Sequence, residues 1–258
     1  MDILDEYVKT APGNQAALDL FKGEWSSAMP AHTGLVPTPG SVGLFEDGRI
    51  AWAEQQASFF GKSVLELGPL EGGHSYMIQK YGARSIKAVE SNSRAFLKCL
   101  IVKQIFNLDR VEFVLGDFNR YLETTDEKFD VCVASGVLYH CTDPVRTLAE
   151  IAKISRKLFL WTHYYDHDII SASTTLAPFF EQPKTEQING SQVGSCRKNY
   201  NNALEWQGFC GGSEPYAIWL ERNSLMETLR QNGFGDIRIN FDQPDHPNGP
   251  ALALFAQR

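Results

Sequence analysis

Three acidic residues lie where a ligand site of an α/β sheet would need them. Glu66, Glu90 and Asp117 each stand near or just after the end of an apolar run of strand length. The carboxyl ends of parallel strands meet at one edge of an open sheet, and ligands bind there. A solvated loop acid would explain Glu90 alone, and a helix N-cap would explain Asp117 alone. Three acids in register favour a shared site.

The side chains in this register suit an adenosine group. The two carboxylate oxygens of Glu90, after the second strand, match the two hydroxyls of a ribose. Asp117 can accept a hydrogen bond from an adenine amine, and Phe118 beside it can pack on the ring.

A glycine-bearing turn opens the same pattern. Within residues 63–75 an apolar run is followed by Gly68 and Gly72, and a residue without a Cβ lets a ligand approach the backbone closely. Leu70 stands where a dinucleotide-binding turn carries its second glycine, and Glu71 would repel a pyrophosphate. We therefore expect a ligand with adenosine but no phosphate, such as S-adenosylmethionine.

Strand and helix patterns alternate after this turn. Apolar runs predict strands at 64–67, 85–90, 111–115, 129–135, 157–162, 236–241 and 251–256, and helical spacing predicts helices at 75–81, 94–106, 145–154 and 222–232. The short loop between the last two strands predicts an antiparallel hairpin. The predicted fold class is α/β, with a doubly wound, Rossmann-like, seven-stranded and mostly parallel sheet closed by that C-terminal hairpin.

Two segments lie outside this rhythm. Residues 1–60 precede the core pattern, show helical spacing at 14–22 and 49–60, and carry aromatic side chains that either pack on the core or form a cap or lid. Residues 163–216 show no clear period and are too long for a simple connection. We predict an N-terminal cap, a core domain over 61–258, and a substrate-side insertion within it.

Several stretches together resemble the class I S-adenosylmethionine-dependent methyltransferases. The resemblance lies in residues 66–72, Glu90, residues 116–118 and residues 129–140, and it covers roughly residues 60–163. It implies that Glu90 holds the ribose and Asp117 the adenine edge, with the turn 135–140 beside the methionine part. Leu70 departs from the family's usual glycine. The predicted cofactor-binding residues are Glu66, Gly68, Pro69, Gly72, Glu90, Ser91, Asp117, Phe118 and Ser135.

The predicted reaction needs alignment of an acceptor with the methyl group, which is chiefly a proximity effect. His140 follows the fourth strand and can take a proton near neutral pH, but it can equally anchor the turn 139–144. His163, after the fifth strand, is the second catalytic candidate. The predicted substrate-binding residues are Tyr139, Tyr165 and Trp206.

The run 163–168 holds two histidines and two aspartates. Such a set can bind a divalent metal ion. A polar loop or helix start explains it as well, and we predict no metal site.

Charge and composition indicate which classes of function to expect. The net charge of −7 disfavours a general nucleic-acid binder, and no signal peptide or apolar run of membrane-spanning length is present. Five cysteines without metal or redox spacing suggest a reduced, cytoplasmic setting. The oligomeric state stays open, a homo-oligomer included.

We therefore expect an enzyme that transfers a methyl group from S-adenosylmethionine to an oxygen or nitrogen of a small-molecule metabolite. Two alternatives stand beside it. One is a tRNA-modifying enzyme, because the run 129–140 also resembles wobble-uridine carboxymethyltransferases, although its carboxylated cofactor would need a nearby cation. The other is a non-catalytic module that binds S-adenosylmethionine. Leu70 argues against an NAD-linked oxidoreductase.

Overall fold

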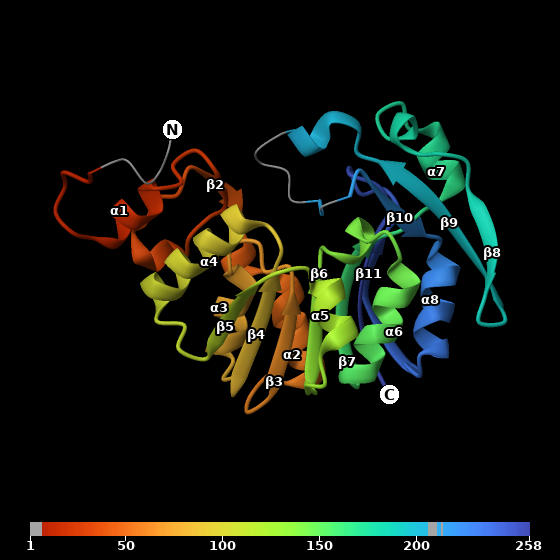
Figure 1. The fold of residues 1–258 in the computed structure, drawn as a ribbon, viewed down its shortest axis with the longest axis horizontal. Coiled ribbons are helices and arrows are strands. Elements are labelled where there is room, and N and C mark those ends of the chain that lie inside the picture. The colour runs from red at the N-terminus through yellow and green to blue at the C-terminus, as the bar shows by residue number, and fades with distance from the viewer. Residues whose placement is uncertain (1–6, 206–210, 213) are drawn as a thin grey trace.

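A seven-stranded sheet forms the centre of the molecule (Figure 1). The computed structural model describes residues 7–205, 211–212 and 214–258. The strand order is β11-β12-β7-β6-β3-β4-β5. Its strands are β3 (Ser63–Leu67), β4 (Ser85–Glu90), β5 (Val111–Leu115), β6 (Val131–Ser135), β7 (Lys157–His163), β11 (Asp236–Gln243) and β12 (Ala251–Gln257). The predicted fold class is confirmed, because β12 pairs antiparallel with β11 and with β7 and the other strand pairs of this sheet are parallel.

Helices cover both faces of this sheet. The helices that cover it include α3 (Gly73–Lys80), α4 (Ser93–Phe106), α5 (Phe118–Thr124), α6 (Pro144–Ile154) and α8 (Arg222–Gln231). Apolar residues of α5, α6 and α8 pack with Leu65 and Leu67 on one face. Those of α3 and α4 pack with Val64 on the other, because successive strand residues point to opposite faces. This two-sided burial explains why the strands read as continuous apolar runs.

Two local predictions differ from the structure. The fourth predicted strand begins at Val131, and Phe129 makes only an isolated bridge to Ser155. Helix α5 was not predicted. It is short, and it begins where the Asp117 side chain accepts a hydrogen bond from the Asn119 amide.

The N-terminal segment packs on the core at the upper left of Figure 1. It contains α1 (Asn14–Asp19), β1 (Trp25–Ser27), β2 (Pro39–Val42), α2 (Gly48–Ala57) and the short 3₁₀ helices η2 (Ala31–Thr33) and η3 (Leu44–Glu46). Strands β1 and β2 form a small parallel pair. Trp25 and Phe45 are buried in the core cluster that also holds α3 and α4. For these two aromatics, core packing is the role that the structure shows.

The insertion is regular, which corrects the expectation of a segment without a period. It contains α7 (His167–Ala172), β8 (Lys184–Ile188), β9 (Ser191–Asn199) and β10 (Tyr216–Leu220), with the 3₁₀ helices η5 (Ala177–Phe179) and η6 (Asn201–Glu205). Its strands form an antiparallel sheet in the order β10-β9-β8, at the upper right of Figure 1. Tyr165, Cys196 and Trp219 are part of its own small core.

Among the described residues, no helix is both long enough and apolar enough to span a bilayer.

Candidate active site

A cavity of about 470 Å³ opens at the carboxyl ends of the parallel strands. Its wall includes seven of the nine predicted cofactor residues: Gly68, Pro69, Glu90, Ser91, Asp117, Phe118 and Ser135. The wall also includes Arg49, His74, Tyr139, His140 and Trp161. The size suits a small-molecule site.

The turn after β3 takes the backbone path of a glycine loop in spite of Leu70. Gly68 and Leu70 both have left-handed backbone angles, with φ of 64° and 56°. The Leu70 amide donates to Glu90 Oε2 at 3.0 Å, which holds the leucine in that conformation. A Cβ on Gly68 would lie 2.6 Å from Val137 Cγ1, so this position requires glycine.

Glu90 is placed to accept hydrogen bonds from a ligand. Its two carboxylate oxygens accept from the Asn92 amide at 2.8 Å and the Leu70 amide at 3.0 Å. Each oxygen has a second lone pair for a ligand hydroxyl. Burial raises the pKa of Glu90, and the backbone amides oppose that shift.

The wall fits an adenosyl group on two further observations. The Ser135 hydroxyl is buried and has no hydrogen-bond partner among the described residues, as expected for a group that a ligand satisfies. Asp117 is the N-cap of α5, which confirms the helix-cap role considered for it in the sequence. It also lies on the cavity wall with Phe118.

Two predicted cofactor residues lie behind the turn, outside the cavity wall that the described residues form. Glu66 is 1% exposed and accepts a hydrogen bond from the Ser75 hydroxyl; burial raises its pKa. Gly72 caps α3 with φ of 77°, and a Cβ there would press on the Phe113 ring at 3.1 Å. Both residues shape the turn from its core side.

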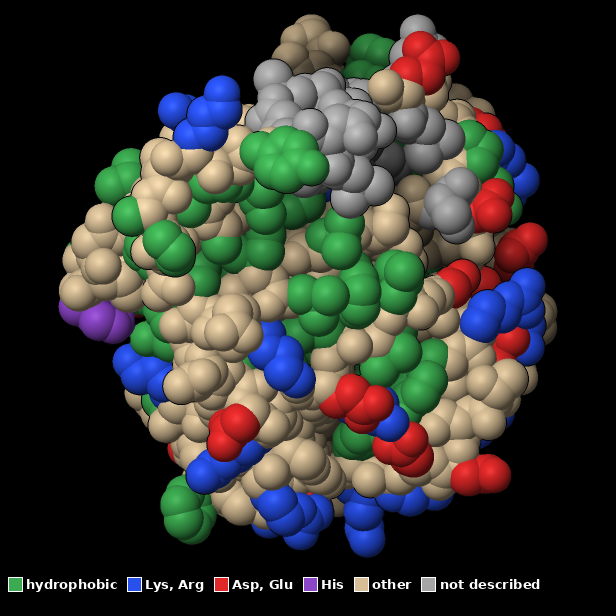
Figure 2. Space-filling view, turned by 60° about the vertical axis from the view of Figure 1, so that its left-hand side comes forward, with side chains coloured by type: hydrophobic (Ala, Val, Ile, Leu, Met, Phe, Trp, Pro, Cys, Tyr) green, Lys and Arg blue, Asp and Glu red, His purple; other side chains and the backbone are tan. Residues whose placement is uncertain are grey.

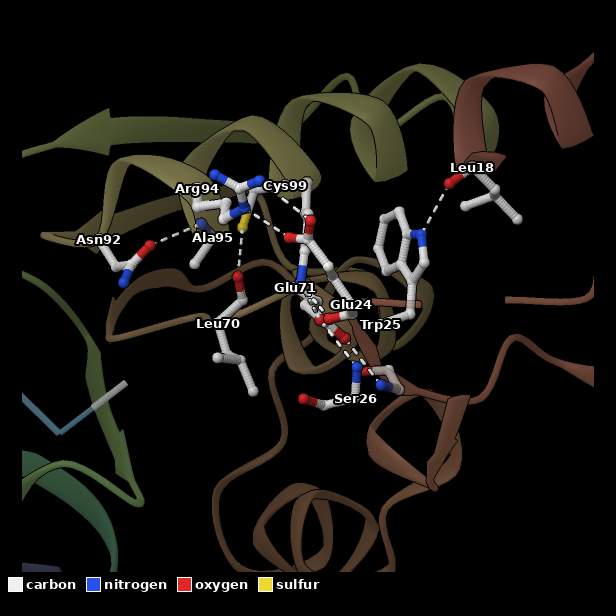
Figure 3. Close-up of polar contacts among 12 residues, drawn as sticks. Leu18, Glu24, Trp25, Ser26, Leu70, Glu71, Asn92, Arg94, Ala95 and Cys99 are labelled. Carbon is white, nitrogen blue, oxygen red and sulfur yellow. Dashed lines mark hydrogen bonds and ion pairs between the residues drawn. The ribbon is translucent and has the colours of Figure 1, made fainter. Parts of the chain in front are cut away.

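Glu71 also points away from the cavity. It is fully buried and accepts from the amides of Ser26 at 3.0 Å and Ser27 at 2.7 Å, and from Lys98 Nζ at 2.9 Å (Figure 3). The argument that Glu71 repels a phosphate ligand is therefore wrong, because Lys98 neutralises it within the protein. The side chain joins β1 to the turn and to α4.

His140 lies on the cavity wall. Its Nδ1 is 2.7 Å from the Tyr200 hydroxyl. Burial lowers the pKa of His140 to about 3, and the charge of Lys198 adds to the shift. The ring is therefore neutral near pH 7. It can accept a proton at Nε2 only when Nδ1 carries the hydrogen and donates to Tyr200.

The structure does not bring His163 to the described part of the cavity wall. The residue is 6% exposed, and its Nδ1 donates to the Gly249 carbonyl at 2.8 Å. Its ring stacks on Trp219 with centroids 5.0 Å apart. Burial lowers its pKa to about 4. These contacts fasten the end of β7 to the loop before β12.

The three predicted substrate residues have different positions. Tyr139 lies on the cavity wall. Tyr165 is buried in the core of the insertion, and its hydroxyl is 3.0 Å from His167 Nδ1. Trp206 lies outside the described residues. In the described part of the chain, no group of three His, Cys, Asp or Glu side chains is arranged to hold a metal ion.

Sequence reasoning missed Arg49, His74 and Trp161. Asp47 caps α2, forms an ion pair with Arg49 Nη2 at 2.6 Å, and contacts His74 Nε2 at 2.8 Å. The Arg49 guanidinium lies over the Trp161 ring, 4.4 Å from its centroid. The start of a helix at Asp47 is readable from sequence, but the contact of Asp47 with His74 in α3 is not.

Known proteins resemble this chain in both sequence and fold. Residues 65–158 match a family described as "Methyltransferase domain". A tRNA U34 carboxymethyltransferase of Campylobacter hominis is 31% identical over 111 residues, which cover 42% of this chain and 38% of that protein. The match thus spans well under half of the relative's length.

Solved structures share the fold. The N-terminal domain of EvdMO1, crystallised with SAH and D-fucose, has a TM-score of 0.62 at 23% identity, over 85% of this chain and 84% of that one. Magnesium protoporphyrin IX methyltransferase from Synechocystis, with bound SAH, has a TM-score of 0.54 at 16% identity, over 82% and 81%. The chain thus contains a match to a methyltransferase domain over residues 65–158, and it shares its fold with methyltransferases that were crystallised with SAH.

Proposed function

We propose that this protein transfers a methyl group from S-adenosylmethionine to an oxygen or nitrogen of a small molecule. The observation that carries the proposal is one cavity whose wall holds both the adenosine-type residues Glu90 and Asp117 and the aromatic residues Tyr139 and Trp161. A methyl donor and an acceptor can therefore lie in contact within it, which is the main requirement of the reaction.

The cofactor part of the wall has a defined task for each residue. Glu90 would accept from the ribose hydroxyls, Phe118 would pack on the adenine, and Ser135 would donate its unpartnered hydroxyl. When bound, S-adenosylmethionine supplies a methyl group that its sulfonium already activates. The protein has to align an acceptor with it and exclude water.

The role of His140 stays a prediction with two forms. As a base, it would take the acceptor proton at Nε2 while Nδ1–H donates to Tyr200. Its pKa of about 3 makes it a weak base for a neutral alcohol or amine. As an anchor, it would hold the turn after β6 against the insertion through the same hydrogen bond.

A tRNA substrate is the second candidate function. The 31% identity to a carboxymethyltransferase supports it, and Arg49 is a cation in the cavity that a carboxylated cofactor would need. The face in Figure 2 argues for a small molecule instead, because its Lys and Arg side chains are interspersed with Asp and Glu, and the net charge is −7. RNA binding draws on a predominantly basic face.

Calorimetry with SAH tests the cofactor site. Glu90→Ala should weaken SAH binding roughly 10- to 100-fold, since hydrogen bonds to a charged group are worth about 1.5–3 kcal/mol. Glu227→Ala, which removes a half-exposed acid on α8, is the matched control and should leave affinity unchanged. An unaltered affinity in Glu90→Ala would remove this residue from the site.

Transfer of labelled methyl groups tests the acceptor class. The protein, a cell extract and S-adenosylmethionine with an isotopic methyl label should give label in the small-molecule fraction. Label confined to RNA would replace the leading proposal with the second candidate.

A further inference from the structure

One part of the cavity wall, beside Gly136, is rich in hydrogen-bond donors. Arg49 and Tyr139 both lie on that wall, and Trp161 lies between them, with its ring 4.4 Å from the guanidinium and 5.7 Å from the phenol ring centroid. We call Arg49, Tyr139 and Trp161 the donor corner. It borders Gly136, where a Cβ would lie 3.1 Å from Trp161 and 3.7 Å from the Tyr139 hydroxyl.

Arg49 is fixed in place and still has free donors. Its Nε and Nη2 donate to Asp47 at 2.9 Å and 2.6 Å. Asp47 is in turn held by His74. Of the five N–H groups of a guanidinium, those on Nη1 have no hydrogen-bond partner among the described residues, and only 23% of the side chain is exposed. A positively charged, preorganised donor therefore faces the cavity.

Tyr139 adds a second donor. Its hydroxyl has no hydrogen-bond partner among the residues that the structure describes, although it lies on the cavity wall. Burial raises the pKa of Tyr139 to about 12, and the Arg49 charge opposes that shift. The phenol therefore keeps its proton near neutral pH and can donate it in a hydrogen bond.

We propose that the donor corner binds an oxyanion, a carboxylate or an acidic phenolate, and that this oxyanion is the methyl acceptor. The inference rests on the proposed methyltransferase function and names its substrate class. Charge-assisted hydrogen bonds from a guanidinium fork match the geometry of such groups. Glu90, Asp117 and Glu214 also line the cavity. Its two other arginines, Arg120 and Arg146, are exposed and form ion pairs with Glu123, so we expect the negative charge of the ligand to lie against Arg49.

An oxyanion acceptor needs no general base. The acceptor oxygen donates the electron pair that forms its bond to the methyl carbon, the carbon–sulfur bond breaks with its pair going to sulfur, and no proton has to leave. His140, with its pKa of about 3, is then not needed as a base. The methylated product has lost its negative charge and is held less tightly by Arg49.

Binding of matched probes to the SAH-saturated protein tests this. Benzoate should bind roughly tenfold or more tightly than benzamide in calorimetric titration, and 4-nitrophenolate more tightly than nitrobenzene, because one charge-assisted contact is worth at least about 1.4 kcal/mol. The two pairs distinguish a carboxylate site from a phenolate site. Arg49→Gln should abolish the preference, Arg49→Lys should keep part of it, and Arg94→Gln, which removes an ion pair with Glu24 away from the cavity, should keep all of it.

Each other outcome decides against the proposal. Equal binding of the neutral probes, no binding of either anion, or a preference that survives Arg49→Gln would overturn it. A loss of SAH affinity of about tenfold or more in Arg49→Gln would assign the guanidinium to the cofactor carboxylate instead. Absence of SAH binding to the unmodified protein is a different result, since it rejects the proposed function itself. SAH binding by Arg49→Gln also shows that the variant is folded.

Discussion

The N-terminal segment and the insertion are both additions to the central sheet. Both bury apolar side chains in its core clusters, but they differ in the charged contacts that hold them. Two buried carboxylates fasten the N-terminal segment: Glu71 binds the Ser26 and Ser27 amides and Lys98, and Asp47 joins Arg49 to His74. The insertion is attached through aromatic packing, with Trp219 stacked on His163 and its indole N–H donating to the Tyr139 carbonyl at 2.9 Å.

This difference bears on how each segment serves the site. A carboxylate buried with its cation and its amide donors fixes one geometry, because a shifted partner would leave a charge unpaired. We therefore interpret the N-terminal segment as a fixed wall that places Arg49 at the cavity. From the sequence alone, a lid had remained an alternative. The insertion reaches the site through Tyr139 and His140, whose contacts to Trp219 and Tyr200 link it to the turn after β6.

We expect the largest loss of stability when the carboxylate that attaches the N-terminal segment is removed. Glu71→Ala leaves Lys98 and two buried amides without their carboxylate, so the free energy of unfolding should fall by about 3–5 kcal/mol. Urea denaturation measures this. Glu24→Gln removes the partly exposed pair with Arg94 and should cost only about 0–1 kcal/mol. Similar losses in the two variants would contradict the assignment of the attachment to Glu71.

A smaller effect is the pH dependence of stability that His163, the stacking partner of Trp219, contributes. His163 has a pKa of about 4 in the folded protein against an ordinary 6.5. Between these values the unfolded chain binds more protons, so stability is complete above pH 6.5 and falls as the pH drops toward 4, by up to about 3 kcal/mol. His163→Gln should remove this part of the slope in urea denaturation measured across that range.

The matched control for the pH experiment is His32→Gln in the N-terminal segment, where the side chain is exposed. It should leave the slope unchanged. A slope that is the same in His163→Gln and in the unmodified protein would show that His163 is not buried in the neutral form.

The smallest effect concerns the hydrogen bond of the insertion. Trp219→Phe keeps a ring in the aromatic cluster but leaves the Tyr139 carbonyl without its indole donor. Stability should fall by about 1–3 kcal/mol. Trp52→Phe is the control, because this partly buried indole donates no hydrogen bond among the described residues. Equal costs in the two variants would mean that ring packing alone attaches the insertion.

The sequence by itself determined the sheet and the acids at its carboxyl edge. Strands β4 and β5 were predicted at their observed bounds, and Glu90 and Asp117 lie on the cavity wall as expected. Apolar runs and strand ends are local patterns, and the parallel arrangement brings their carboxyl ends together whatever the side chains nearby. Leu70 adopts a left-handed backbone conformation in this turn, and its amide donates to Glu90.

Only the tertiary structure decided where the other polar side chains point. Glu71 and Pro69 lie in the same turn, yet Pro69 lines the cavity while Glu71 is buried against Ser26 and Lys98. Arg49 reaches the cavity because Asp47 meets His74, which is 27 residues away in the chain. The direction of each of these side chains depends on partners that are distant in sequence. Local sequence periodicity therefore does not predict it. The turn after β3 was readable from sequence, whereas the charges around it were not.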